Sequence, residues 1–180
     1  KYSFDENGKM RFGFVDDSKN ILNNEDNAIL SAPYYFGTND DGARTSGWLQ
    51  YIDGFQDTNY EDDFYWFWFK SNGQKIKDTK KTINGKTYVF DENGVMGYKF
   101  KNATLGGEDA TAYFNSASDG SLAKNQWIWA VPSKEIHAGD NSDDEYRWFR
   151  SDASGKLITG KTKKVNGKWY VFDEVGRMKK

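Results

Sequence analysis

An internal repeat of about 82 residues constrains the fold of this chain more than any other feature of its sequence. Residues 88–96 (YVFDENGVM) recur as residues 170–178 (YVFDEVGRM), and a third copy stands at residues 2–10 (YSFDENGKM). The same offset continues back without a gap to Asp62, which falls on Asp144. In repeat proteins each unit buries its apolar side chains mainly against its neighbours. The sequence therefore predicts an array of similar units.

A shorter unit lies inside the long repeat: an aromatic strand ends in Phe, and a polar turn of three to five residues leads to Gly. Aromatic residues favour the extended backbone, and Asn, Asp, Ser and Gly supply turn geometry. A second turn signal is Asn-Gly, at residues 84–85 and again at 166–167, which is typical of two-residue hairpin loops. Each unit is thus predicted to be a β-hairpin. The Phe positions are Phe4, Phe36, Phe67, Phe90, Phe114, Phe149 and Phe172.

These units predict an all-β fold, a solenoid-like array of stacked β-hairpin repeats, because an isolated hairpin is only marginally stable. Three hairpins make one super-repeat. We expect residues 1–180 to form a single repeat module, with super-repeats at about 2–86 and 87–168 and a partial one at 169–180. Residues 19–30 are compatible with a short helix or an irregular loop. The side chains expected in the core are Tyr35, Phe36, Phe90, Phe114, Val171 and Phe172.

Composition favours aromatic rings that are displayed as well as buried. Aromatic residues make up 17% of the chain, whereas the mean hydropathy is −0.90. Tyr and Trp can pack along one edge and remain hydrated along the other. The 25 Lys and Arg residues do not exceed the 27 Asp and Glu residues, so no basic excess indicates nucleic-acid binding. No apolar run reaches the length of a membrane span, and no signal peptide is visible.

The sequence gives little support to catalysis or metal binding. Cysteine is absent, which excludes disulfides and thiolate metal sites, and His137 is the only histidine. No serine–histidine–aspartate arrangement is indicated, and stacked hairpins offer no deep cleft for a pair of catalytic carboxylates. The acidic segments at residues 57–63 and 140–145 lack the ligand spacing of a calcium loop and are read as solvated insertions. We therefore expect a non-enzymatic protein without metal or cofactor.

The repeat resembles the cell-wall-binding, or choline-binding-type, repeats of Gram-positive surface proteins and autolysins, which are related to glucan-binding repeats. Their pattern runs Gly-Trp, several residues, Gly-x-Trp-Tyr-Tyr-Phe, a turn and Gly-x-Met. Gly47-Trp48 matches the first step, and residues 166–178 (NGKWYVFDEVGRM) match the second half. Residues 84–96 (NGKTYVFDENGVM) do likewise, with Thr87 in place of Trp. The chain begins in the middle of a repeat, so we expect it to be a piece of a longer protein.

The resemblance implies sites in which two or three aromatic rings from successive hairpins surround a choline headgroup. A quaternary ammonium donates no hydrogen bonds, and ring faces attract it through cation–π interaction. Carried over by motif, the candidate ligand-binding residues are Trp48 with Trp66 and Tyr88, Trp127 with Trp148 and Tyr170, and Trp169. Insertions at residues 53–63 and 132–145 fall between the paired aromatic residues.

The sequence therefore favours a non-catalytic cell-wall or glycan-binding module. It would anchor a larger secreted protein to the bacterial surface and cell wall through weak aromatic sites for teichoic acid choline or for sugar units. An alternative stays open, in which the chain is a structural spacer or protein-interaction stalk whose aromatic side chains are all buried. Side-chain exposure separates the two, because a binder leaves paired rings open and a stalk covers every Trp.

Overall fold

The computed structural model describes residues 1–16, 18, 30–52, 64–133, 136 and 145–179. Most of the predicted helix-or-loop segment at 19–30, all of the inserted loop at 53–63 and most of the one at 132–145 lie outside the described residues. The described residues form twelve β-strands: β1 (Phe14–Val15), β2 (Tyr34–Tyr35), β3 (Gly47–Tyr51), β4 (Tyr65–Phe69), β5 (Thr79–Ile83), β6 (Lys86–Phe90), β7 (Lys99–Leu105), β8 (Glu108–Phe114), β9 (Trp127–Ala130), β10 (Arg147–Arg150), β11 (Lys161–Val165) and β12 (Lys168–Phe172).

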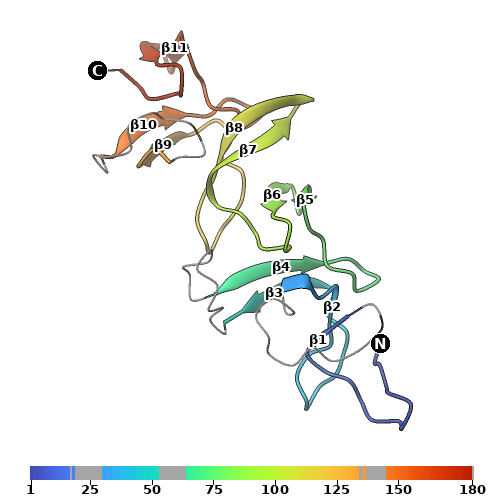
Figure 1. Ribbon diagram of the computed structural model, residues 1–180. Coiled ribbons are helices and arrows are strands. Elements are labelled where there is room, and N and C mark those ends of the chain that lie inside the picture. Colours follow the sequence, from blue (N-terminus) through green and yellow to red (C-terminus); the bar gives the residue numbers. More distant parts are fainter. Residues whose placement is uncertain (17, 19–29, 53–63, 134–135, 137–144, 180) are drawn as a thin grey trace. The chain divides into compact units, whose positions relative to one another are not determined.

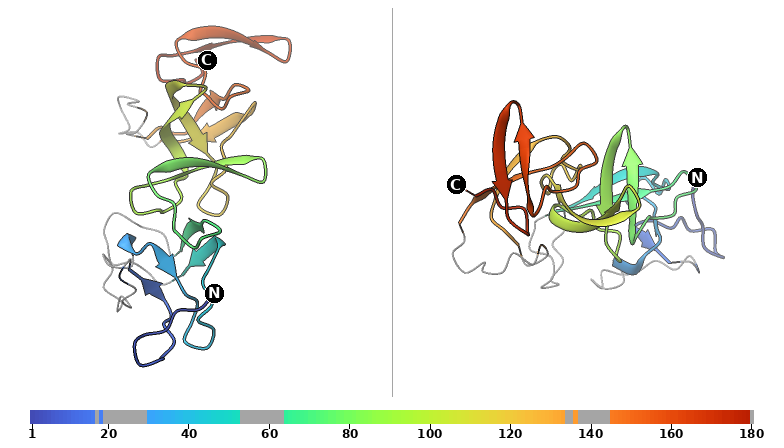
Figure 2. Two further views of the ribbon diagram at one scale, coloured as in Figure 1. Left: turned by 90° about the vertical axis from the view of Figure 1, so that its right-hand side faces the viewer. Right: turned by 90° about the horizontal axis from the view of Figure 1, so that it is seen from above.

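The strands pair in chain order as six two-stranded sheets: β1 with β2, β3 with β4, β5 with β6, β7 with β8, β9 with β10, and β11 with β12 (Figure 1). The registered pairs are antiparallel; Leu49 faces Phe67 in one hairpin, and Ile128 faces Phe149 in another. The predicted all-β array of hairpins is confirmed. The hairpins are visible as separate ribbons in the two views of Figure 2, with β11 and β12 drawn in red and orange.

One turn recurs after the second strand of several hairpins and uses an aspartate. Asp91 Oδ1 accepts hydrogen bonds from the backbone N–H groups of Asn93 and Val95, both at 2.9 Å. Asp173 Oδ1 accepts from the corresponding amides two and four residues ahead, at 3.1 and 2.8 Å. Gly94 ends the first of these turns with a φ of 82°, in the region that glycine tolerates best. The Phe-Asp…Gly pattern therefore encodes a turn fixed by its own carboxylate.

The turns after Phe67 and Phe149 begin two residues later than predicted. Strand β4 continues to Phe69, which forms a bridge to Lys75, and Ser151 forms the equivalent bridge to Leu157. Two further residues of β4, Trp68 and Phe69, continue the alternation of half-buried and buried side chains, which explains the longer strand. The turns before Gly73 and Gly155 thus match the three-residue turns elsewhere in the chain.

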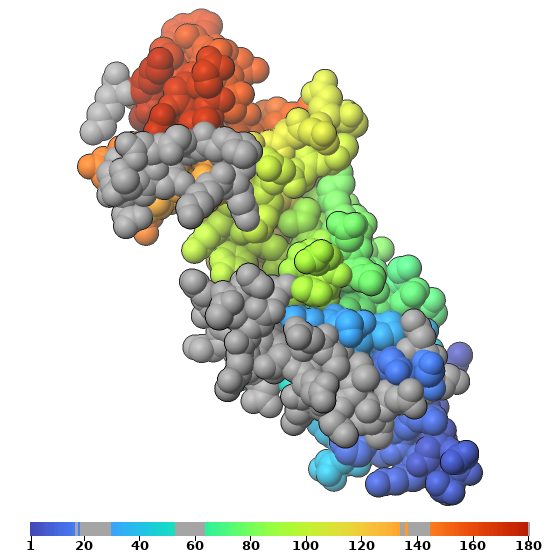
Figure 3. Space-filling model, viewed as in Figure 1, coloured from blue at the N-terminus to red at the C-terminus, as the bar shows by residue number. Residues whose placement is uncertain are grey.

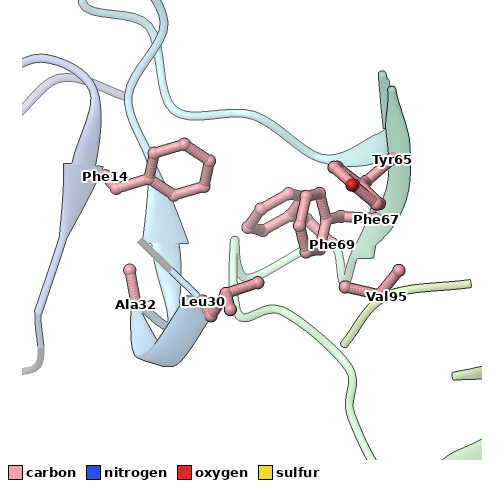
Figure 4. Packing of buried hydrophobic residues seen from close by; sticks show 7 residues of the cluster. All are labelled: Phe14, Leu30, Ala32, Tyr65, Phe67, Phe69 and Val95. Carbon is pink, nitrogen blue, oxygen red and sulfur yellow. The ribbon is translucent and has the colours of Figure 1, made fainter. Parts of the chain in front are cut away.

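The chain divides into two compact units. Unit 1 comprises residues 1–79 and 90–96, and unit 2 comprises residues 80–89 and 97–180. The core of unit 1 gathers side chains from several hairpins, shown in Figure 4: Phe14, Leu30, Ala32, Tyr65, Phe67, Phe69 and Val95. Alternation along β4 points its odd-numbered side chains inward and leaves Trp66 and Trp68 on the opposite face.

Unit 2 has two buried clusters of its own. In the larger, the rings of Phe100 on β7 and Phe149 on β10 lie 4.9 Å apart, and Ile128 packs with them from β9. In the smaller, Phe114 on β8 is completely buried beside Leu122. Neighbouring hairpins therefore supply each other's cores, as a repeat array requires.

The predicted core residues are mostly buried, with two differences. Phe36, Phe90, Phe114 and Phe172 are buried as expected, whereas Tyr35 is half-buried against the core of unit 1. Val171 is 42% exposed, so its assignment to the core is wrong. It lies next to the buried Phe172 on β12, and adjacent residues of a strand point to opposite faces.

Candidate functional site

The first aromatic cluster is centred on Trp48 of β3, in unit 1. Its ring centroid lies 5.9 Å from that of Trp66, at an interplanar angle of 86°, and 5.3 Å from that of Trp68, at 75°. The ring of Phe90 lies 5.9 Å from Trp48. All three tryptophans are half-buried, so each retains solvent-accessible ring surface. The predicted pair Trp48 and Trp66 is thus brought together, and Trp68 joins it.

The second cluster is centred on Trp127 of β9, in unit 2. Its ring lies 6.2 Å from Trp148, at 85°, and 4.8 Å from Tyr170, at 68°. Phe172 stacks on it at 6.0 Å with an interplanar angle of 28°. These rings come from β9, β10 and β12, which belong to two successive hairpins. Trp148 and Tyr170, which were predicted to share this site with Trp127, therefore each lie beside its ring.

The strand register relates the residues of one cluster to those of the other and shows where they differ. Trp48 lies opposite Trp68 on β4, and Trp127 lies opposite Arg150 on β10. The ring pairs Trp48–Trp66 and Trp127–Trp148 share nearly the same perpendicular geometry. Where unit 1 adds a third indole, unit 2 therefore places a guanidinium, whose central carbon lies 5.8 Å from the Trp127 ring centroid.

The second tryptophan of each cluster is held by a backbone hydrogen bond to the chain that follows. The N–H of Met96 donates to the carbonyl of Trp66 at 2.9 Å, and that of Met178 donates to the carbonyl of Trp148 at 2.8 Å. Met96 itself is buried. The indole Nε1–H of Trp66 is buried and has no hydrogen-bond partner among the described residues.

Trp169 does not join the second cluster. It is 68% exposed and lies opposite Lys164, whose Nζ lies 5.8 Å from its ring centroid. Its neighbour Tyr170 faces Trp127, and consecutive side chains of a strand point to opposite faces. In the part of the chain that the structure describes, Trp169 therefore stands apart from the predicted cage.

Tyr88 is half-buried on β6 and belongs to unit 2, whereas Trp48 and Trp66 belong to unit 1. Burial raises the pKa of the Tyr88 hydroxyl, and the negative charge of Asp119 adds to that increase. The grouping of Tyr88 with Trp48 and Trp66 stays a prediction.

Sequence reasoning missed three aromatic residues around these clusters. Trp129 and Tyr146 are 51% and 54% exposed, and their rings stack at 5.7 Å with an interplanar angle of 23°. Trp129 also lies 4.9 Å from Trp148, which is 41% exposed. The third is Trp68, which was missed because the turn after Phe67 was predicted two residues too early. For Trp129 the signal was present, since it alternates with the apolar residues at 128 and 130 and so shares a face with Trp127.

A groove in unit 2 runs beside Arg150. Its charged lining residues are Arg150, Asp152, Lys163 and Lys164. Asp152 Oδ1 accepts hydrogen bonds from the N–H groups of Ser154 and of Lys156, so this carboxylate is committed to its own turn. Both lysines are exposed, and in Figure 3 the side chains of the C-terminal hairpin (red) form part of the surface shown. The groove therefore carries a net positive charge.

The described residues give no further support for a metal site or for a membrane-spanning helix. No cluster of three His, Cys, Asp or Glu side chains there could hold a metal ion. No helix in those ranges has the length and apolar character of a membrane span. His137 and the acidic segments at 57–63 and 140–144 lie outside the described residues.

Comparison with known proteins shows which of them share this fold. No protein-family profile matches the chain. Glucosyltransferase-S of Streptococcus mutans serotype c is 27% identical over 128 residues, which cover 71% of this chain and 7% of that protein. The structure is similar to the modular autolysin LytC from Streptococcus pneumoniae, with a TM-score of 0.55, 20% identity, and coverage of 99% of this chain and 33% of that chain.

It is also similar to choline binding protein F from Streptococcus pneumoniae, with a TM-score of 0.57, 20% identity, and coverage of 99% of this chain and 48% of that chain. A second structure of the autolysin, in complex with a synthetic peptidoglycan ligand, has a TM-score of 0.56 at 21% identity. This chain thus spans less than half of each structural neighbour and a small part of the glucosyltransferase. It has the hairpin-repeat fold of these choline-binding repeat proteins, and the predicted resemblance is confirmed.

Proposed function

We propose that this chain, which shares the hairpin-repeat fold of the choline-binding proteins, is a non-catalytic module that binds bacterial cell-wall polymers through its Trp48 and Trp127 clusters. The module would hold a larger secreted protein at the cell surface. Choline of teichoic acid and sugar units of wall glycans are its two candidate ligands. Millimolar affinity at each site is expected for ligands this small, and retention would arise from several sites acting together.

The observation that carries this proposal is the paired, partly open rings of both clusters. In each cluster two perpendicular tryptophan rings lie about 6 Å apart and stay partly exposed, and exposed aromatic rings attract a quaternary ammonium or the apolar face of a sugar. A spacer would bury such rings. Instead Trp129, Trp148 and Trp169 are all more than two-fifths exposed, which argues against the stalk alternative.

The fold and its neighbours also support a binding role over catalysis. One structural neighbour is a choline binding protein, and the structure of another holds a synthetic peptidoglycan ligand. The match to the glucosyltransferase covers only 7% of that enzyme, so it carries no argument for transferase activity in this chain.

Intrinsic fluorescence tests the proposal directly. Titration with choline chloride or with soluble wall-glycan fragments should shift or quench tryptophan emission, because the ligand would contact the indole faces. Trp48→Ala and Trp127→Ala should each remove part of the response, and Trp169→Ala, which alters an isolated exposed ring, should leave it in place. Unchanged emission with both ligand classes, together with no retention on purified cell walls, would refute the function.

A further inference from the structure

We propose that Arg150 makes the two clusters select different ligands: the Trp48 cluster accepts a quaternary ammonium, and the Trp127 cluster rejects it and takes an uncharged sugar. This inference rests on the proposed binding function and assigns a ligand class to each cluster. It arises from the residues that lie opposite the two central tryptophans, Trp68 in unit 1 and Arg150 in unit 2.

The two clusters share most of their ring geometry, although Gln50 lies opposite Trp66 where Trp129 lies opposite Trp148. Both clusters keep the perpendicular pair of tryptophans, at 5.9 Å and 6.2 Å, and both keep a Phe ring at 5.9 Å and 6.0 Å, Phe90 in one case and Phe172 in the other. The residue opposite the central tryptophan differs. In unit 1 an indole lies 5.3 Å from Trp48 and adds a further electron-rich face.

In unit 2 the guanidinium of Arg150 already lies over the face of Trp127. The attraction between a cation and a ring depends on the ring's quadrupole, and an internal cation at 5.8 Å uses the face that a quaternary ammonium would need. Arg150 forms no ion pair within the described residues. The positive charge of its guanidinium would repel a cationic ligand.

The neighbouring charges reinforce the effect. Lys163, which lies opposite Tyr170 on β12, lines the same groove as Arg150, and the one acidic side chain there, Asp152, is held in its turn. A sugar suits this environment for two reasons. Its apolar C–H face stacks on Trp127 and Trp148, and its hydroxyl groups can accept hydrogen bonds from the guanidinium, which carries five N–H donors.

Two like charges about 6 Å apart near a protein surface repel enough to weaken binding roughly tenfold or more. The reciprocal exchange tests this at both positions. Calorimetric titration with choline chloride should give one site in the wild-type protein, and Trp48→Ala should remove it. Arg150→Trp should add a second choline site, whereas Trp68→Arg should weaken choline binding by about tenfold or more.

Two further variants distinguish the effect of the Arg150 charge from the effect of adding an aromatic ring. Arg150→Met removes the guanidinium without adding a ring and should also admit choline to the Trp127 cluster. Lys164→Met is the matched control, because Lys164 lies over Trp169 at the same 5.8 Å and should not change choline binding. Titration with a neutral glucan oligosaccharide should show binding that Trp127→Ala removes. Circular dichroism establishes that each variant is folded.

The outcomes distinguish this inference from the function on which it rests. Equal choline affinity at both clusters of the wild-type protein would overturn it, and so would an unchanged number of choline sites in folded Arg150→Trp and Arg150→Met proteins. In either case glycan or choline binding as such would remain, and the proposed function with it. A wild-type protein that binds neither choline nor glucan would instead refute the proposed function itself.

Discussion

Lys75 is a charged residue in a position that the second super-repeat fills with a leucine. It is 6% exposed, and its counterpart Leu157 is 7% exposed. The Lys75 Nζ donates a hydrogen bond to the carbonyl of Leu30 and lies 5.0 Å from the centroid of the Phe67 ring. Desolvation lowers its pKa to about 8, opposed by the nearby Asp91 and assisted by Lys77. A buried ammonium therefore costs the folded state free energy at neutral pH.

That cost gives the free energy of unfolding a defined pH dependence. The folded-state pKa of about 8 lies below the ordinary value of 10.5, so between these values the unfolded chain binds more protons at Lys75. Stability should rise from about pH 8 to 10.5 through this group. Lys75→Met should remove the rise and stabilise the protein at pH 7 by up to about 3 kcal/mol. Denaturant unfolding of both proteins at pH 7 and 10.5 measures the difference; parallel pH profiles would contradict the prediction.

Gly8 and Gly94 offer a second comparison between single residues. Both follow the sequence FDEN and have nearly the same φ, 78° and 82°. A Cβ on Gly94 would lie 2.7 Å from the backbone oxygen of Ile76, whereas a Cβ on Gly8 would meet nothing within 4 Å. The backbone conformation is thus equally demanding at both positions, and the space around them differs.

Gly8→Ala should cost about 1–2 kcal/mol, the strain of a left-handed alanine. Gly94→Ala should cost clearly more, because the clash with a backbone oxygen requires the chain to shift. Chemical denaturation of the two variants beside the wild-type protein gives both values. Equal losses of stability would show that packing around Gly94 relaxes freely.

At the scale of the hairpin, an aspartate turn follows the second strand of several hairpins, at Asp91, Asp152 and Asp173. Asp152 shows its electrostatic consequence: hydrogen bonds from the Ser154 hydroxyl and from the backbone amides of its turn lower its pKa, although burial acts in the opposite direction. The charged carboxylate is therefore favoured in the folded state.

Asp152 should contribute stability that is complete well above pH 3.8 and is lost as the pH falls through its lower folded-state pKa. Asp152→Asn keeps an acceptor oxygen but does not titrate, so it should flatten the acid limb of the stability profile. Asp152→Ala removes the acceptor and should destabilise the protein by about 1–2 kcal/mol at neutral pH. Thermal melts from pH 2 to pH 7 record both effects, and an acid limb unchanged in the Asn variant would exclude this role.

The hairpins could be predicted because local chemistry encodes them. Asn84 and Asn166 take φ values of 50° and 48°, as the two-residue loop requires, and the Phe-Asp…Gly turns are fixed by nearby hydrogen bonds. Where turn signals were ambiguous, as after Phe67, the strand end was placed two residues too early. Burial against the rest of the unit, which no local pattern reports, decided that boundary.

The candidate site was predictable in part for the same reason. Trp127 and Trp148 could be paired by motif, because the repeat fixes their strands. The role of Arg150 could not be found, since it depends on which residue of β10 lies opposite Trp127, and register follows from turn positions on both strands. Trp169 was placed in the cage by its match to the motif, although strand alternation turns it away from Tyr170.

At the scale of the whole molecule, one cluster lies in each compact unit. Weak sites on one chain reinforce each other when a polymer engages both, so retention on a polymeric wall should exceed what either site supports alone. Trp48→Ala and Trp127→Ala should each reduce retention on purified cell walls, and the double variant should abolish it. A monomeric ligand, in contrast, occupies each cluster separately. If the double variant were retained as well as either single one, the two clusters would not act together.

The two units are compact in space and interleaved along the backbone. Residues 80–89 belong to unit 2, residues 90–96 return to unit 1, and residue 97 opens the remainder of unit 2. A fragment cut after Thr79 would leave Trp48 without the ring of Phe90 and would strip Val95 from the apolar cluster around Phe67. No single cut of the backbone can therefore separate the two units intact. A natural or engineered shortened form of such an array must therefore end at a point after which the backbone does not return to an earlier unit.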